Sequence, residues 1–285
     1  MESQVILSPT RINRWVRCRR SYHWRYNRHL VRLTKSAPLS LGIIVSEVLA
    51  AYYGVDSEAR SQEIIDTQLE VSTREAKPLS LGDSPRPKVI KEWEKVETVL
   101  PRLLSTYHQR AQSKDNFKVI QVETSQQVEL APNIHLLAIP DAIVEVDEDT
   151  LMVFEHKVRS RYHTGDFGID FQSVASCMVS GSIGTLYNIL RYSNMKYYRE
   201  NIMRSGYELD YFKDMFIYIG EDILSTPPER LYPMPMKKCY CDYWELCMAE
   251  IQGVDVDDII SALYRNTHDK KDTEEEEVSN DTETD

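Results

Sequence analysis

Asp141, Glu155 and Lys157 are side chains of this sequence that can do chemistry together. Carboxylate oxygens are the ligands that Mg²⁺ and Mn²⁺ prefer. A bound ion of this kind generates a nucleophilic water and stabilises charge on a phosphodiester during hydrolysis. A neighbouring lysine can orient or deprotonate that water, or stabilise the phosphate charge. The backbone carbonyl of His156 is a further candidate ligand. The pattern predicts a metal-dependent hydrolytic site.

The residues around these side chains predict a pair of β-strands. Residues 134–146 form an apolar segment that carries the aspartate, and residues 151–158 form a second one after an acidic turn. Alternation along the second segment places Glu155 and Lys157 on one face and His156 on the other. The same residues also fit an exposed hairpin with an ordinary Glu–Lys ion pair. Taken alone, they leave both interpretations open.

The composition predicts a globular protein. With 285 residues, of which 42% are hydrophobic, the chain can bury a full core as one large domain. Its apolar runs are shorter than the roughly 20 residues that cross a bilayer, and its N-terminus lacks the pattern of a signal peptide. We therefore expect no membrane association and a cytoplasmic protein, found at the nucleoid or, if phage-encoded, in the host cytoplasm.

The net charge of −11 is unevenly distributed along the chain. Residues 269–285 hold nine acids and two lysines, a local charge of 2 − 9 = −7, whereas the first 35 residues hold nine Arg/Lys and one acid, a local charge of +8. An acidic segment of this kind is typically solvated and can contact a protein partner. The basic segment predicts a surface that faces phosphates. The overall charge therefore does not exclude nucleic acid.

The hydrophobic periodicity and the turn residues predict the order of the elements. Ser8 is a natural N-cap and Pro9 fits the first position of a helix. Strands dominate from 117 to 158, and an acidic, unpacked tail is expected over 254–285. The other expected elements are helices at 39–53, 57–77, 88–112, 169–179 and 207–224, a loop at 78–87 and a strand at 185–192.

Three of the five cysteines lie within nine residues, which favours a metal site. Thiolates of this kind can hold a 4Fe–4S cluster or a structural Zn²⁺. Cys177 fits a helix interior instead.

Read in order, these motifs resemble the RecB-like branch of the PD-(D/E)XK nucleases, in particular its iron–sulfur exonucleases. The resemblance covers residues 8–250. It starts with an opening helix at 8–26 that carries Cys18 and continues through a helix at 41–53. It is completed by Pro140-Asp141, by Glu155-His156-Lys157, by Gln172 on the following helix and by the distal cysteines. The resemblance implies that Cys18, Cys239, Cys241 and Cys247 hold a 4Fe–4S cluster, with a structural Zn²⁺ as the alternative, and that this group staples the N-terminal helix to the C-terminal segment.

The resemblance implies an α/β, restriction-endonuclease-like fold with a mixed central sheet flanked by helices. Residues 1–253 would form the nuclease domain, with a helical lobe at about 40–113. Asp141 and Glu155 would bind Mg²⁺ or Mn²⁺, Lys157 would position the water, and Gln172 would orient the site. The implied activity is a DNA exonuclease acting on single strands or ends in recombination, repair or processing, and the implied metal of the cysteines is iron–sulfur.

Three departures from the family pattern keep an alternative open. Ser46 stands where the family has a histidine, and Ser176 where it has a tyrosine four residues after Gln172. The distal cysteines read Cys-x-Cys-x₅-Cys, one residue tighter than usual. A catalytically weakened nuclease-fold protein that binds nucleic acid or assists assembly is the alternative; a zinc-stapled structural protein is a third.

Several basic side chains are candidate nucleic-acid contacts, because arginine pairs well with phosphate. A solvated surface explains any single one of them equally well, and packing is the better interpretation for the aromatic residues among them. Glu123 is interpreted as a structural strand residue. The candidate contacts are Arg14, Arg17, Arg20, Arg159 and Arg161.

Overall fold

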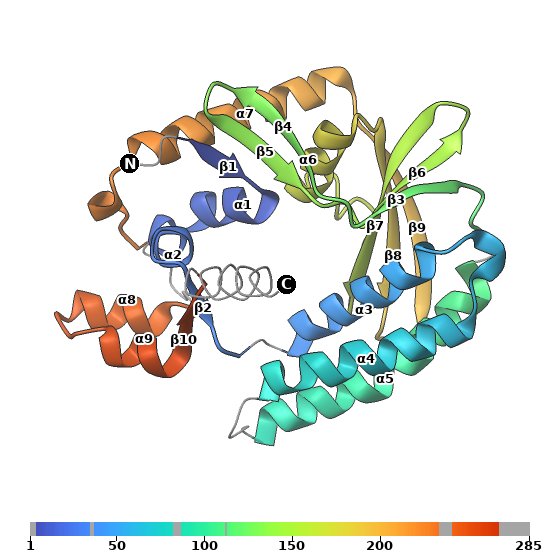
Figure 1. Cartoon of the computed structure of the whole chain (residues 1–285), viewed down its shortest axis with the longest axis horizontal. Coiled ribbons are helices and arrows are strands. Elements are labelled where there is room, and N and C mark those ends of the chain that lie inside the picture. The colour runs from blue at the N-terminus through green and yellow to red at the C-terminus, as the bar shows by residue number, and fades with distance from the viewer. Residues whose placement is uncertain (1–3, 35–36, 82–86, 112, 234–240, 268–285) are drawn as a thin grey trace, which may run out of the picture.

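The computed structural model describes residues 4–34, 37–81, 87–111, 113–233 and 241–267. Its centre is a mixed five-stranded sheet with helices on both faces (Figure 1). The predicted α/β class with a mixed central sheet flanked by helices is confirmed. In spatial order the strands are β3 (Lys118–Val122), β6 (Ala142–Asp147), β7 (Thr150–Arg159), β8 (Gly184–Arg191) and β9 (Lys196–Met203), of which β7 and β8 are parallel and the other neighbours antiparallel.

A smaller sheet is separated from the first by helix α6 (Phe171–Ser180), which packs against strands of both. Its strands, in spatial order, are β1 (Val5–Leu7), β5 (Ile134–Ala138) and β4 (Gln126–Ala131). β1 runs parallel to β5, and β4 runs antiparallel to it. The first strand of the chain therefore pairs with a strand from its middle.

The segment 134–146, which was predicted to be one strand, is divided between the two sheets. β5 ends at Ala138 and β6 begins at Ala142. Pro140 lies between them, and proline has no backbone N–H to donate to a neighbouring strand. The prediction of a single strand was wrong. Asp141 instead lies where the chain passes from one sheet to the other.

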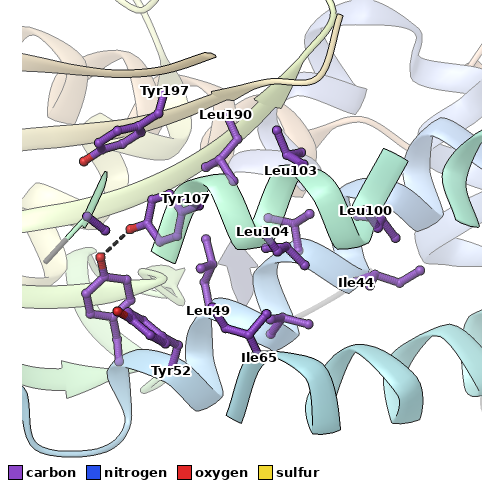
Figure 2. Packing of buried hydrophobic residues seen from close by; sticks show 14 of the residues in the cluster. Ile44, Leu49, Tyr52, Ile65, Leu100, Leu103, Leu104, Tyr107, Leu190 and Tyr197 are labelled. Carbon is purple, nitrogen blue, oxygen red and sulfur yellow. Dashed lines mark hydrogen bonds between the residues drawn. The ribbon is translucent and has the colours of Figure 1, made fainter. Parts of the chain in front are cut away.

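Three helices cover one face of the five-stranded sheet, in the range predicted for a helical lobe: α3 (Ala37–Tyr53), α4 (Gln62–Leu81) and α5 (Pro87–Ala111). The predicted loop at 78–87 begins too early, because α4 continues through Pro78 to Leu81. Residues of these helices and of β8 and β9 form a common core. Figure 2 shows this packing for Ile44, Leu49, Tyr52, Ile65, Leu100, Leu103, Leu104, Tyr107, Leu190 and Tyr197.

The opposite side is built from α1 (Pro9–Arg17), α6, α7 (Gly206–Ser225) and the small sheet. The predicted start of α1 is confirmed, since the Ser8 hydroxyl accepts a hydrogen bond from the backbone N–H of Arg11 at 3.2 Å. The expected opening helix at 8–26 is interrupted at Cys18, whose backbone is extended, and the short helix α2 (Arg19–Tyr22) and a π-helix (His23–Asn27) follow. Trp15 and Tyr22 are buried here, which confirms packing rather than exposure of these rings.

The C-terminal part of the described chain contains α8 (Trp244–Ile251), α9 (Asp257–Leu263) and β10 (Tyr264–Asn266). β10 pairs with β2 (Leu30–Arg32), so this segment packs beside the N-terminal part of the chain (Figure 1). The prediction of an unpacked tail from residue 254 was therefore wrong for α9 and β10. The rest of that predicted tail, 268–285, lies outside the described residues. None of the helices in the described ranges has the length and apolar character that a membrane crossing requires.

Gly220 gives a test of this packing. A Cβ atom added to it would lie 2.7 Å from Cγ2 of Ile134, a buried and stiff β-branched side chain of β5. We expect Gly220→Ala to lower the free energy of unfolding by about 1–3 kcal/mol, although alanine favours helix more than glycine. Urea denaturation measures the change.

Gly206→Ala is the matched control, because Gly206 belongs to the same helix and a Cβ atom there meets nothing within 4 Å. This variant should be close to the parent in stability. Equal stability of the two variants would contradict the close contact between α7 and β5.

Candidate active site

The acids and the lysine of the sequence prediction meet on two adjacent strands. Ala142 of β6 is paired with Phe154 of β7, so the next pair in this antiparallel register is Asp141 with Glu155. The predicted alternation along β7 is observed: Glu155 and Lys157 face the start of α6, whereas Phe154 packs into the core with α3 and α5. The structure thus brings Asp141, Glu155 and Lys157 together.

The Lys157 ammonium is held by groups from β7 and α6. Its Nζ donates to Glu155 Oε1 at 2.8 Å and to Gln172 Oε1 at 2.8 Å. A third group, Asp170 Oδ2, lies 3.7 Å away. Burial alone would lower the pKa of Lys157, but the neighbouring carboxylates, Glu155 foremost, outweigh it and raise this pKa. The lysine is therefore a fixed cation.

Asp170 is a residue of this site that the sequence analysis missed. It caps α6, since its Oδ1 accepts from the backbone N–H of Gln172 at 3.1 Å, and its Oδ2 accepts from the Tyr187 hydroxyl at 3.0 Å. The capping pattern of an aspartate before an apolar helix was a signal for its position. Its proximity to Lys157 depends on how α6 lies over the sheet, which the sequence does not reveal.

Glu155 has an incomplete set of partners. The residue is 1% exposed, one carboxylate oxygen accepts from Lys157, and Oε2 has no hydrogen-bond partner among the described residues. Burial, with a smaller contribution from Asp141, raises the pKa of Glu155 to about 8. A buried carboxylate of this kind needs a proton or a cation.

The donor set of Asp141 and Glu155 fits a hard divalent cation, because it offers carboxylate oxygens, one of them buried and unpartnered. The backbone carbonyl of His156 was predicted as a third ligand. Within the described residues, no group of three or more His, Cys, Asp and Glu residues is arranged to hold a metal ion. A metal at Asp141 and Glu155 would therefore need backbone or water oxygens as further ligands.

Asp141 is fixed through both of its oxygens. Oδ2 accepts from the backbone N–H of His156 at 2.7 Å, and Oδ1 accepts from the Ser46 hydroxyl at 3.1 Å. The same hydroxyl lies 3.3 Å from Glu123 Oε1, so Ser46 stands between two carboxylates. Burial raises the pKa of Asp141, partly offset by the hydrogen bond from His156. Glu123, interpreted from the sequence as structural, thus lies at the exposed rim of the site.

The side chain of His156 lies on the other face of β7, as predicted. Its ring stacks on Tyr53 at a centroid distance of 5.6 Å, and burial lowers its pKa to about 3. Its Nδ1 is 2.7 Å from Asn188 Nδ2, which also donates to the Tyr107 hydroxyl at 3.0 Å. The imidazole is therefore neutral, and its contacts with Tyr53 and Asn188 hold β7 on the face opposite Lys157.

The three described cysteines of the predicted cluster lie in segments that pack together. Cys18 and Cys247 are buried and Cys241 is half-buried, while Cys239 lies outside the described residues. Cys18 caps α2, where its Sγ accepts from the backbone N–H of Ser21. An ion pair between Arg20 and Glu250 joins α2 to α8. Cys177 is buried in α6, as expected of a core residue.

The five candidate arginines fall into two groups. Arg14 donates to the Ser21 hydroxyl at 2.9 Å, and Arg20 is engaged with Glu250 and stacks over Trp24. These two support the fold. Arg17, Arg159 and Arg161 are exposed to solvent, and the guanidinium of Arg159 lies over the ring of Phe167 at 5.9 Å.

Comparison with known proteins gives a family match and two solved structures. The family model of the PD-(D/E)XK nuclease superfamily matches residues 6–248. No curated protein sequence matches the chain. A candidate exonuclease from Eubacterium rectale is 10% identical, with a TM-score of 0.51, over 85% of this chain and 87% of that one. The protein SSO0001 is 15% identical, with a TM-score of 0.35, over 88% and 86% of the two chains.

These structural likenesses concern the fold alone, and the one to SSO0001 is too distant to carry an argument. The family match is broader. It runs from β1 to α8 and includes the two acids, the lysine and Gln172. The protein belongs to the PD-(D/E)XK nuclease superfamily.

Proposed function

We propose that this protein is a metal-dependent DNA exonuclease that acts on single strands or DNA ends during recombination, repair or processing of DNA. The observation that carries the proposal is the buried carboxylate of Glu155, with one oxygen 2.8 Å from Lys157 Nζ and the other unpartnered. The family supports nuclease chemistry, and the likeness to a candidate exonuclease agrees with action at ends.

Asp141 and Glu155, with the backbone carbonyl of His156, would hold Mg²⁺ or Mn²⁺. The bound ion would supply Lewis acidity toward the phosphate and lower the pKa of a bound water. Lys157 is kept protonated by its carboxylate neighbours, so it serves as a hydrogen-bond donor and a positive charge rather than a base. It would position the attacking water or the phosphate oxygen. Gln172 fixes Lys157 through its side-chain oxygen.

We further propose a cluster site at Cys18, Cys239, Cys241 and Cys247. Its support is the ion pair between Arg20 of α2 and Glu250 of α8, which joins the segments that carry the buried Cys18 and Cys247. A 4Fe–4S cluster is favoured by the family resemblance, with Zn²⁺ as the alternative. The group would staple the two ends of the nuclease domain.

Ser46 favours a second candidate function, a catalytically weakened nuclease-fold protein that binds nucleic acid or acts in assembly. The resemblance places a histidine at this position of α3. Here the serine hydroxyl bonds to Asp141 and faces Glu123, so this position offers a hydroxyl and not an imidazole. Such a protein would bind DNA and leave it uncut.

Lys157→Ala tests the proposed catalytic group. Loss of the ammonium should reduce Mg²⁺- or Mn²⁺-dependent digestion of end-labelled DNA by at least about 100-fold, because a preorganised donor is typically worth that much. Lys95→Ala, which replaces an exposed lysine of α5, serves as control and should leave digestion unchanged. Equal digestion by parent and Lys157→Ala would refute the role. A parent that binds DNA without digesting it would favour the second candidate.

Glu155→Gln tests the metal site through stability. Between its unfolded pKa of 4.5 and its folded pKa of about 8, the folded metal-free protein keeps a proton that the unfolded chain has lost. Stability therefore falls as the pH rises through this window, and glutamine removes that loss. We expect the variant to be more stable than the parent at pH 8 by about 1–3 kcal/mol without metal.

Mg²⁺ should then stabilise the parent and have little effect on Glu155→Gln, since a ligand stabilises only a state that binds it. Thermal unfolding with and without Mg²⁺ gives both comparisons. Glu94→Gln, at an exposed position of α5, controls for the lost charge. An equal response of both variants to Mg²⁺ would show that Glu155 is not a ligand.

The cluster proposal predicts a coloured protein after anaerobic purification. Broad visible absorbance and about four iron atoms per chain are expected for a 4Fe–4S cluster. Cys247→Ser should lose both the colour and the iron, whereas Cys177→Ser should keep them. Stoichiometric zinc without colour would select the alternative, and the absence of both metals would refute a cluster site.

A further inference from the structure

A cleft of about 580 Å³ lies at the β9 edge of the five-stranded sheet, apart from the groups assigned above. Three segments wall it: the turn after α5, the loop after β7, and β9 itself. Lys114 comes from the first segment, Tyr162 and His163 from the second, and Tyr197 and Tyr198 from the third. We call it the β9 cleft.

The β9 cleft contains two cations, one of which forms no ion pair among the described residues. Lys114 is exposed and forms no ion pair among the described residues; its ammonium lies 5.2 Å from the ring centre of Tyr197. Arg199, at the base, pairs with Asp115 and donates to the backbone oxygen of Lys114 at 3.0 Å. Glu200 is the acid of the lining, and it is already engaged by the Tyr162 hydroxyl and by the backbone N–H of Gly165. An anion would therefore find a free cation here.

The β9 cleft also presents aromatic rings. Tyr198 is half-buried, and its ring lies 5.3 Å from that of Tyr162. Tyr197 is 8% exposed and packs into the core beneath the cleft. An exposed cation beside tyrosine rings is a combination that binds a phosphate and stacks a base. An acidic peptide would use the cations but leave the rings without partners.

The register of the sheet places this cleft near the proposed catalytic centre. Lys157 of β7 is paired with Ile189 of β8, which is paired with Tyr198 of β9. Two strand spacings separate Lys157 from Tyr198, roughly 10 Å between backbones. Tyr198 therefore lies on the same face of the sheet as Lys157, with the buried Ile189 between them.

We infer that the β9 cleft binds a nucleotide of the single-stranded DNA substrate, next to the scissile position. The phosphate contacts Lys114 and the imidazole of His163, and the base stacks on Tyr198 beside Tyr162. This inference rests on the proposed function, because it names a contact for the same substrate. It gives the protein a preference for unpaired DNA, since a paired base cannot reach the tyrosine ring.

The test measures binding of a fluorescently labelled single-stranded oligonucleotide to the Lys157→Ala protein over a range of salt concentrations. Adding Lys114→Ala should weaken binding and reduce the slope of log K against log salt by about 0.7, the value of one phosphate contact on a single strand. Lys118→Ala is the matched control, because Lys118 lies at the opposite edge of the same sheet and its side chain is 75% exposed. It should leave the slope unchanged.

Tyr198→Ala should weaken binding by about 5- to 100-fold, and Tyr198→Phe should restore it, because stacking needs the ring and not the hydroxyl. Thermal unfolding confirms that each variant is folded. If Lys114→Ala and Tyr198→Ala bind as tightly as Lys118→Ala with the same slope, the cleft is not a binding site. If the Lys157→Ala parent binds no DNA at all, the proposed function fails, which is a distinguishable result.

Discussion

The parallel pairing of β7 with β8 is the constraint on which the site depends. Parallel strands cannot be joined by a tight turn, so the chain leaves the sheet after Arg159 and returns at Gly184. The crossing segment consists of a loop and α6. The start of α6 brings Asp170 and Gln172 to Lys157, and the loop forms one wall of the β9 cleft. The crossover between β7 and β8 thus places both the groups proposed for catalysis and the groups proposed to bind single-stranded DNA.

The buried polar groups on the two faces of β7 differ in their formal charge. On the α6 face, three carboxylates surround a single ammonium, that of Lys157, which leaves a formal excess of 1 − 3 = −2. These carboxylates are Asp141, Glu155 and Asp170. Excess negative charge away from water is unfavourable unless protons or cations bind. This face is therefore built to receive a cation.

On the opposite face, the polar groups form a chain that leads away from β7. It runs from His156 through Asn188, Tyr107 and Tyr53 to Asp115. Arg60 and Arg199 both lie against this last carboxylate, so the excess here is 2 − 1 = +1. Hydrogen-bonded networks of this kind rigidify a core. The backbone N–H of His156 also donates to Asp141. This network therefore holds β7, the strand that carries Glu155 and Lys157.

Local patterns predicted what depends on local sequence. The alternation of residues 151–158 was enough to assign the faces of Glu155, His156 and Lys157, and Ser8-Pro9 was enough to place the first helix. Other features depend on which strands become neighbours. Asp170 and Glu123 reach the site only because α6 and β3 lie beside β7 and β6. The local sequence around these two acids does not indicate that placement. The same applies to α9 and β10, because the acids at 255, 257 and 258 made this segment resemble a tail.

Ser46, in place of the family's histidine, changes which atoms can bind a metal ion at this position. An imidazole at this position would offer a nitrogen ligand, whereas the serine hydroxyl offers a single proton, shared between Asp141 and Glu123. The hydrogen bond to Asp141 favours its ionised form and leaves a further lone pair on that oxygen. Glu123, exposed and within reach of the same hydroxyl, brings a further carboxylate to the rim. Mg²⁺ and Mn²⁺ prefer oxygen to nitrogen. The serine therefore removes a nitrogen ligand without lowering the number of oxygen atoms available to a hard cation.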